Sequence, residues 1–106
     1  MDPKEVENEI FKLITYSGTA RADLYEALKE TRGNNYNKTE ELLKSVDDKL
    51  VLAHNVQTKL IQEDLNKKLE NSLLLIHAQD QFMTTMSEQS LIEQMIIMQK
   101  EINKLI

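Results

Sequence analysis

The sequence predicts an all-α protein folded as an antiparallel three-helix bundle. Apolar residues make up 41% of the 106 positions, and only two glycines and one proline interrupt them. These apolar residues recur at steps of three and four along most of the chain, and no segment shows the alternation of a strand. Turn-forming residues gather at only two places, near residues 32–35 and 66–71. We expect one helical domain spanning residues 1–106.

The first helix is predicted from Asp2 to about Thr31. Asp2 is a suitable N-cap residue and Pro3 occupies the first helical position, where its missing N–H costs nothing. The residues that then share one face are Val6, Ile10, Leu13, Ser17, Ala20, Leu24 and Leu28.

The second helix follows the turn at Arg32–Asn35, with Asn37 or Thr39 as the expected cap, and frays near Asn66–Lys68. A short connection of this kind favours an antiparallel pair. Its predicted core-facing residues are Leu43, Val46, Leu50, Ala53, Gln57 and Leu60.

The third helix is predicted from Ser72 to Ile106, a stretch without glycine or proline. Its predicted core-facing stripe comprises Ile76, Asp80, Met83, Ser87, Leu91, Met98, Ile102 and Leu105. Further apolar residues lie outside this stripe: Leu74, Leu75, Phe82, Met86, Ile92, Met95, Ile96 and Ile97. This excess indicates self-association through the third helix.

Charge and composition exclude several classes of function. The formal net charge is −5 and the basic residues are scattered among acidic ones, so a nucleic-acid partner is not expected. The chain has no cysteine, which excludes disulfides and thiolate chemistry. No signal-peptide core and no run of about 20 apolar residues occurs, so we expect a cytoplasmic protein without membrane insertion.

Two histidines are the main candidates for chemistry. His77 has Asp80 at i+3 and Gln81 at i+4 as neighbours on a helix face, and a neutral imidazole oriented by such groups is a good nucleophile. Spacing alone, however, also fits an ordinary, partly buried helix histidine. His54 forms a similar pair with Gln57, and we assign it no catalytic role.

Two polar features are predicted inside the bundle. Ser17, Gln57 and Ser87 occupy core-facing positions and could form one buried layer of structural hydrogen bonds. Asp80 lies in the predicted apolar stripe of the third helix, where an unpaired carboxylate is unfavourable. If three copies of this helix met around an axis, their Asp80 side chains would converge and suit Mg²⁺ or a similar divalent cation.

Three passages together resemble the lactose/cellobiose-type IIA components of the phosphoenolpyruvate-dependent sugar phosphotransferase system. Residues Ile14–Leu28 contain a Tyr-x-Gly-x-Ala-Arg pattern, and Ala53–Leu60 is a second matching passage. The most specific passage is His77–Asp80 followed by Met83–Thr85, which is similar to the family pattern His-x-Gln-Asp-x-x-Met-Thr-Thr. The resemblance spans nearly the whole chain.

The resemblance implies a phosphotransferase component that acts as a homotrimer of three-helix bundles. It implies that His77 accepts phosphate from the phosphocarrier HPr and passes it to a IIB component, which serves a IIC membrane component. It also implies one divalent cation per trimer, bound by Asp80 of each subunit. The sequence departs from the family at Gln81, where members commonly carry a second histidine.

Two other functions fit the same sequence. A non-catalytic helical adaptor would use the amphipathic bundle alone and would leave His77 without phosphate. A divergent IIA component acting as a regulator would take up phosphate without passing it on. The sugar is open among lactose, cellobiose and chitobiose, because specificity is expected to reside in the membrane component.

Overall fold

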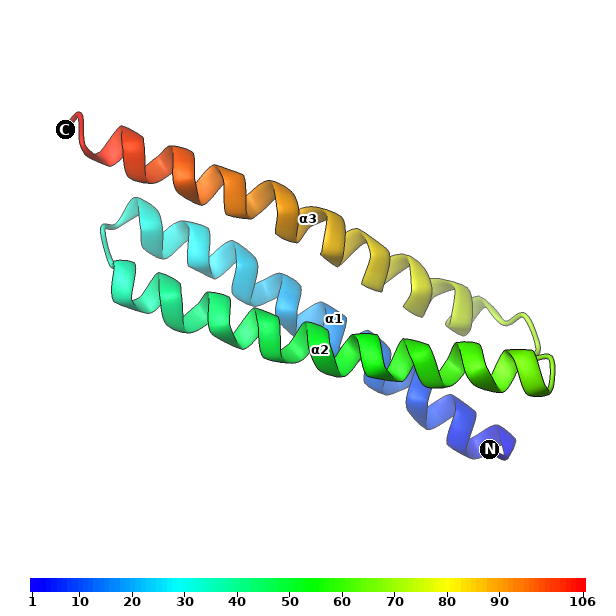
Figure 1. The fold of residues 1–106 in the computed structure, drawn as a ribbon. Helices are drawn as coiled ribbons and strands as arrows, with labels where there is room; N and C mark the ends of the chain where they lie inside the picture. The colour runs from blue at the N-terminus through cyan, green and yellow to red at the C-terminus, as the bar shows by residue number, and fades with distance from the viewer.

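The computed structural model describes all residues of the chain and consists of three long helices (Figure 1). Helix α1 spans Pro3–Arg32, α2 spans Tyr36–Asn66 and α3 spans Leu73–Asn103. They form a rod 57 Å long and 18 Å across in both other directions. No helix combines the length and apolar character needed to cross a membrane. The predicted all-α fold class is confirmed.

The ends of α1 follow from local sequence. Asp2 caps the helix, its side-chain Oδ1 accepting a hydrogen bond of 2.8 Å from the Glu5 N–H, and Pro3 begins the first turn. The chain then reverses through Gly33 and Asn34, and Asn34 takes the left-handed conformation with φ of 62°. This tight reversal lets α2 begin at Tyr36, so the predicted caps at Asn37 and Thr39 are wrong.

The second connection, residues 67–72, joins α2 to α3. Helix α2 ends at Asn66, as predicted, and Ser72 caps α3 by accepting a hydrogen bond of 3.0 Å from the Leu75 N–H. Helix α3 ends at Asn103, three residues before the predicted end. The Asn103 side chain donates to the Thr31 carbonyl at 2.8 Å and to the Tyr36 hydroxyl at 2.9 Å. These two bonds attach the end of α3 to the connection between α1 and α2.

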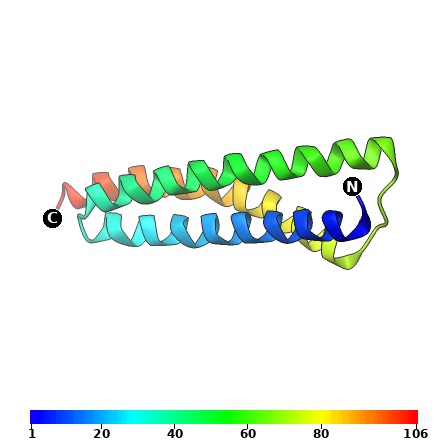
Figure 2. The same cartoon turned by 90° about the horizontal axis from the view of Figure 1, so that it is seen from below.

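The helices run up, down and up, so α1 is antiparallel to α2 and parallel to α3 (Figures 1 and 2). Helix α1 packs along both neighbours, whereas α2 and α3 have little direct contact. Besides the bond from Asn103 to Tyr36, two side-chain hydrogen bonds bridge α2 and α3, from Gln57 to Gln79 at 2.9 Å and from Gln89 to Asp47 at 3.2 Å. Helix α1 is therefore the central element of the bundle.

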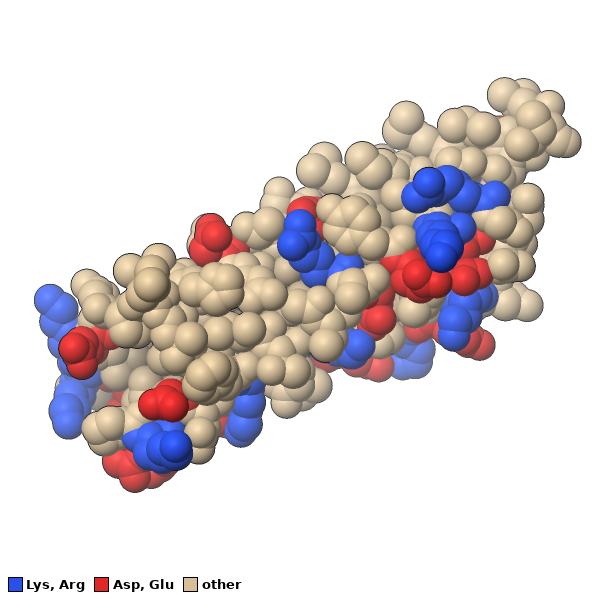
Figure 3. Space-filling model, turned by 180° about the vertical axis from the view of Figure 1, so that it is seen from behind, with Lys and Arg blue, Asp and Glu red and all other residues tan.

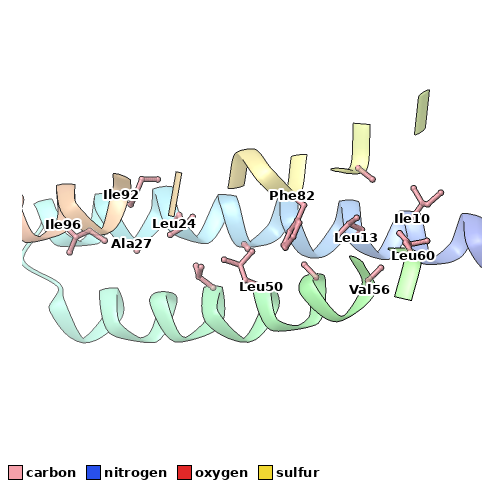
Figure 4. Packing of buried hydrophobic residues seen from close by; sticks show 14 residues of the cluster. Ile10, Leu13, Leu24, Ala27, Leu50, Val56, Leu60, Phe82, Ile92 and Ile96 are labelled. Carbon is pink, nitrogen blue, oxygen red and sulfur yellow. The ribbon is translucent and has the colours of Figure 1, made fainter. Parts of the chain in front are cut away.

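The core is a continuous seam of side chains from all three helices (Figure 4). Phe82 points from α3 into this seam and is 2% exposed. Leu13, Leu24 and Leu60, which lie at other points along the seam (Figure 4), are at most 1% exposed. The predicted core faces of α1 and α2 are confirmed, since most of their members are buried. Burial of this apolar seam is the main driving force for the bundle.

The predicted core stripe of α3 is wrong. Its members are exposed, including Ile76 at 57%, Met83 at 64% and Met98 at 62%. The residues that α3 buries instead are Ala78, Phe82, Thr85, Ile92 and Ile96. Helix α3 is apolar on more than one face, so periodicity could not decide which face packs on α1. The predicted stripe of α3 is instead exposed, and it contributes to the mostly uncharged upper edge of the molecule in Figure 3.

The predicted polar layer of Ser17, Gln57 and Ser87 is also wrong. Ser87 is exposed, and Gln57 bonds to Gln79. The α3 residue that meets Ser17 is Thr85, whose hydroxyl donates to the Ser17 carbonyl at 3.2 Å. The predicted layer fails because α3 packs on α1 with a different face from the predicted one. In this orientation Thr85 points inward and Ser87 points outward.

Candidate functional site

His77 lies in the second turn of α3 and is exposed to solvent. The next residue, Ala78, is completely buried, and Phe82 points into the core, so the helical period carries His77 away from the core. The interpretation of His77 as a partly buried structural histidine is therefore wrong. An exposed imidazole on a rigid helix is accessible to a protein partner.

The start of α3 provides a favourable environment for negative charge near His77. Side chains on a helix lean toward its N-terminus, which directs the His77 side chain toward the first turn of α3. That turn contains no acidic residue, and the N-terminal end of a helix carries a partial positive charge. An anionic group carried on the ring would be stabilised rather than repelled by this end of the helix.

Gln79, two residues after His77, is attached to α2. The Gln57 side-chain N–H donates to Gln79 Oε1 at 2.9 Å, and both residues are partly buried. The predicted His54–Gln57 pair is not formed, and His54 is exposed on α2. Periodicity places Gln57 correctly toward the interior, but it contains no signal for a partner on another helix.

Gln81, one helical turn after His77, lies against Gly18 of α1. A Cβ atom added at Gly18 would come within 2.9 Å of Gln81 Nε2, so the glycine leaves room for the amide. The other end of the amide, Gln81 Oε1, is buried and has no hydrogen-bond partner. A glycine in the middle of a helix is itself a sequence signal for such a close approach, and it could have located this contact.

Asp80 is exposed on the apolar face of α3 that does not pack in the chain. Ile76 and Met83 stand one turn before and one turn after it, and both are more than half exposed. No group of three or more histidine, cysteine, aspartate or glutamate side chains within the chain is placed to hold a metal ion. A divalent cation at Asp80 would therefore need carboxylates from further copies of the chain.

Arg21 and Glu88 join α1 to α3 on the side of the bundle that α2 does not cover. The guanidinium binds the carboxylate through two hydrogen bonds, of 2.6 and 2.9 Å, and also lies over the Tyr25 ring. The hydrogen bond from Arg21 lowers the pKa of the Glu88 carboxyl below its ordinary value. This pair lies three turns beyond His77 and connects the two helices.

A three-helix bundle that carries an exposed histidine on a rigid helix is suited to passing a small group between proteins. A family model described as "PTS system, Lactose/Cellobiose specific IIA subunit" matches residues 8–100. The chain therefore belongs to the lactose/cellobiose-specific IIA family of the sugar phosphotransferase system, whose members are phosphotransferase components.

Individual relatives agree with this assignment. The lactose-specific EIIA component of Streptococcus mutans is 37% identical over 91 residues, which cover 85% of this chain and 88% of that protein. The crystal structure of the cellobiose-specific enzyme IIA from Bacillus anthracis has a TM-score of 0.89 at 31% identity, covering 98% of this chain and 94% of that one. The IIA(chitobiose) structure solved with HPr from Escherichia coli has a TM-score of 0.80 at 34% identity, covering 92% and 96%.

Proposed function

We propose that this chain is a phosphoryl carrier in which His77 accepts phosphate from HPr and passes it to a IIB component. The observation that carries the proposal is the exposed position of His77 within the His-x-Gln-Asp motif, at an end of α3 that favours negative charge. A ring nitrogen forms a new bond to phosphorus as the bond between phosphorus and the donor breaks. The solved complex of a related IIA protein with HPr supports this donor.

The test is phosphorylation of the purified chain. The protein is incubated with phosphoenolpyruvate, enzyme I and HPr, and its intact mass and acid lability are followed. We expect one acid-labile phosphate per chain, and none on His77→Ala. His54→Ala is the matched control, because His54 is the other histidine of the chain and is also exposed on a helix.

The outcome also separates the competing functions. Transfer of the phosphate from His77 to a purified IIB component identifies a carrier that serves transport. Retention of the phosphate in the presence of IIB would instead favour a regulator. An absence of phosphate on the parent chain would contradict both and would leave the helical adaptor.

We further propose that the functional unit is a homotrimer assembled through α3. The exposed stripe of α3 contains Ile76, Met83, Leu91, Met98 and Ile102, each at least 49% exposed in the single chain. Apolar side chains at helical spacing along the length of α3 are suited to packing against the same helix of other copies. Sedimentation equilibrium should give three times the chain mass; a concentration-independent monomer would refute this assembly.

In such a trimer, Asp80 of each subunit would hold a shared divalent cation such as Mg²⁺. The fit rests on Asp80 being the acidic residue between Ile76 and Met83 on the apolar stripe, where hard oxygen ligands could converge. The cation would neutralise carboxylates that otherwise repel one another. We expect a chelator to weaken the parent trimer and to leave Asp80→Asn unaffected; equal sensitivity of both would contradict the metal site.

A further inference from the structure

The side-chain carbonyl of Gln81 is a buried hydrogen-bond acceptor without a donor. Gln81 Oε1 is fully inaccessible and has no partner within the chain. Nearly all buried polar atoms in proteins are paired, so an unpaired one calls for an explanation, of which a functional role is one. Gln81 follows the exposed His77 by one helical turn, so the two side chains are neighbours on the surface of α3.

Gly18 provides the space in which the Gln81 amide lies. An added Cβ at this position would meet Gln81 Nε2 at 2.9 Å and no other atom closely. Glycine in a helix interior is destabilising relative to alanine. The small residue therefore favours the position of this amide at the expense of the stability of α1.

The available donors point to the His77 ring. Side chains on a helix extend toward its N-terminus, which directs Gln81 back over the turn that carries His77. The Gln57 amide already donates to Gln79, and the Thr85 hydroxyl donates to the Ser17 carbonyl. The Ser17 hydroxyl is a rival donor, because it is also buried, has no partner and directly precedes Gly18 in the chain.

We propose that Gln81 is a positioning residue for His77, its Oε1 accepting a hydrogen bond from the ring Nδ1–H. Nδ1 is the ring nitrogen closer to the backbone. Oε1 has no donor in this structure and His77 is exposed, so the bond requires the His77 ring to turn toward the residue one helical turn later. The bond fixes the ring as the Nδ1–H tautomer and leaves the Nε2 lone pair at the outer, exposed end. Unlike a histidine in its place, the amide of Gln81 performs this task without titrating.

This inference rests on the proposed phosphorylation of His77 and specifies how the ring is prepared for it. The Nε2 lone pair forms the bond to phosphorus, while the bond from phosphorus to the donor breaks and its electron pair stays with the donor. Nδ1 keeps its proton throughout, directed at Gln81 Oε1. The orientation of the ring is thereby set before the donor arrives.

The first test uses the full, unphosphorylated chain and needs no phosphate donor. The ring nitrogens are observed by ¹⁵N–¹H correlation NMR about two pH units above the ordinary histidine pKa of about 6.5. We expect His77 to be mainly the Nδ1–H tautomer, and His54 in the same spectrum to show the mixture of a free ring. Gln81→Met keeps the length of the side chain, removes the acceptor and should abolish the preference at His77.

Gly18→Ala fills the space in which the Gln81 amide lies and leaves Gln81 itself unchanged. The new methyl group displaces the flexible end of Gln81, so the tautomer preference should again be lost while the bundle stays folded. Gly33→Ala is the matched control, since the same change at the end of α1 lies far from His77 and should preserve the preference. Ser17→Ala should also preserve it.

The second test measures the rate at which phosphorylated HPr transfers its phosphate. Gln81→Met and Gly18→Ala should slow the transfer roughly tenfold and still reach one phosphate per chain. If parent His77 shows the same mixture as His54, or keeps its tautomer in Gln81→Met, the positioning role is refuted. A correct tautomer without phosphate uptake would instead refute the proposed function and leave the hydrogen bond intact.

Discussion

Phe82 is the side chain whose removal should destabilise the bundle most clearly. It is the largest fully buried residue, 2% exposed, and it lies where α3 packs into the seam (Figure 4). Truncation to alanine loses about 2–3 kcal/mol of transfer free energy. The remaining cavity adds about 2 kcal/mol for each 100 Å³ that does not collapse. We therefore expect Phe82→Ala to lower the free energy of unfolding by about 3–5 kcal/mol.

The chain offers a matched control in its other phenylalanine. Phe11 lies on α1 and is 49% exposed, so its truncation removes about half the buried area and leaves no closed cavity. Phe11→Ala should cost about 1 kcal/mol. Both variants change the same residue type in a helix, so the difference between them reports burial.

Urea unfolding followed by circular dichroism at 222 nm measures both changes. The chains are compared at one fixed concentration, because the stability of an oligomer depends on the concentration of its subunits. A loss of 3–5 kcal/mol is a large share of the roughly 5–15 kcal/mol typical of a domain. Equal losses in the two variants, or a loss below about 1 kcal/mol for Phe82→Ala, would refute the assigned core face of α3.

Two further predictions concern the N-terminal cap of α3 and the ion pair between α3 and α1. Ser72→Ala removes the acceptor for the Leu75 N–H and should lower the free energy of unfolding in urea by about 1 kcal/mol. Ser72→Asp keeps an acceptor and should retain the stability. An equal loss of stability in both variants would contradict the cap. The pKa of Glu88 is lowered by its hydrogen bond from Arg21, so its contribution to stability is present above the ordinary carboxyl pKa and disappears as the pH falls through the lowered value. The difference in melting temperature between the parent and Glu88→Gln should therefore be largest near neutral pH and vanish in acid, and a difference independent of pH would refute the ion pair.

The sequence alone determined the three helices and the candidate nucleophile. Asp2–Pro3 and the steps of three and four placed α1 almost completely, because caps and periodicity are properties of a single helix. The motif around His77 indicated a candidate site for the same reason, since its residues are close together in the chain. The exact start of α2 was missed because one left-handed residue, Asn34, shortened the turn.

Only the tertiary structure decided which face of α3 enters the core. Two faces are apolar, and the choice depends on how Phe82 and the small Ala78 fit against α1, which periodicity does not report. That choice exposes His77 and Asp80 and turns Thr85 toward Ser17. The contacts of Gln79 with Gln57 and of Gln81 with Gly18 likewise join distant parts of the chain. Such contacts arise from packing between helices, so the spacing within any one helix could not predict them.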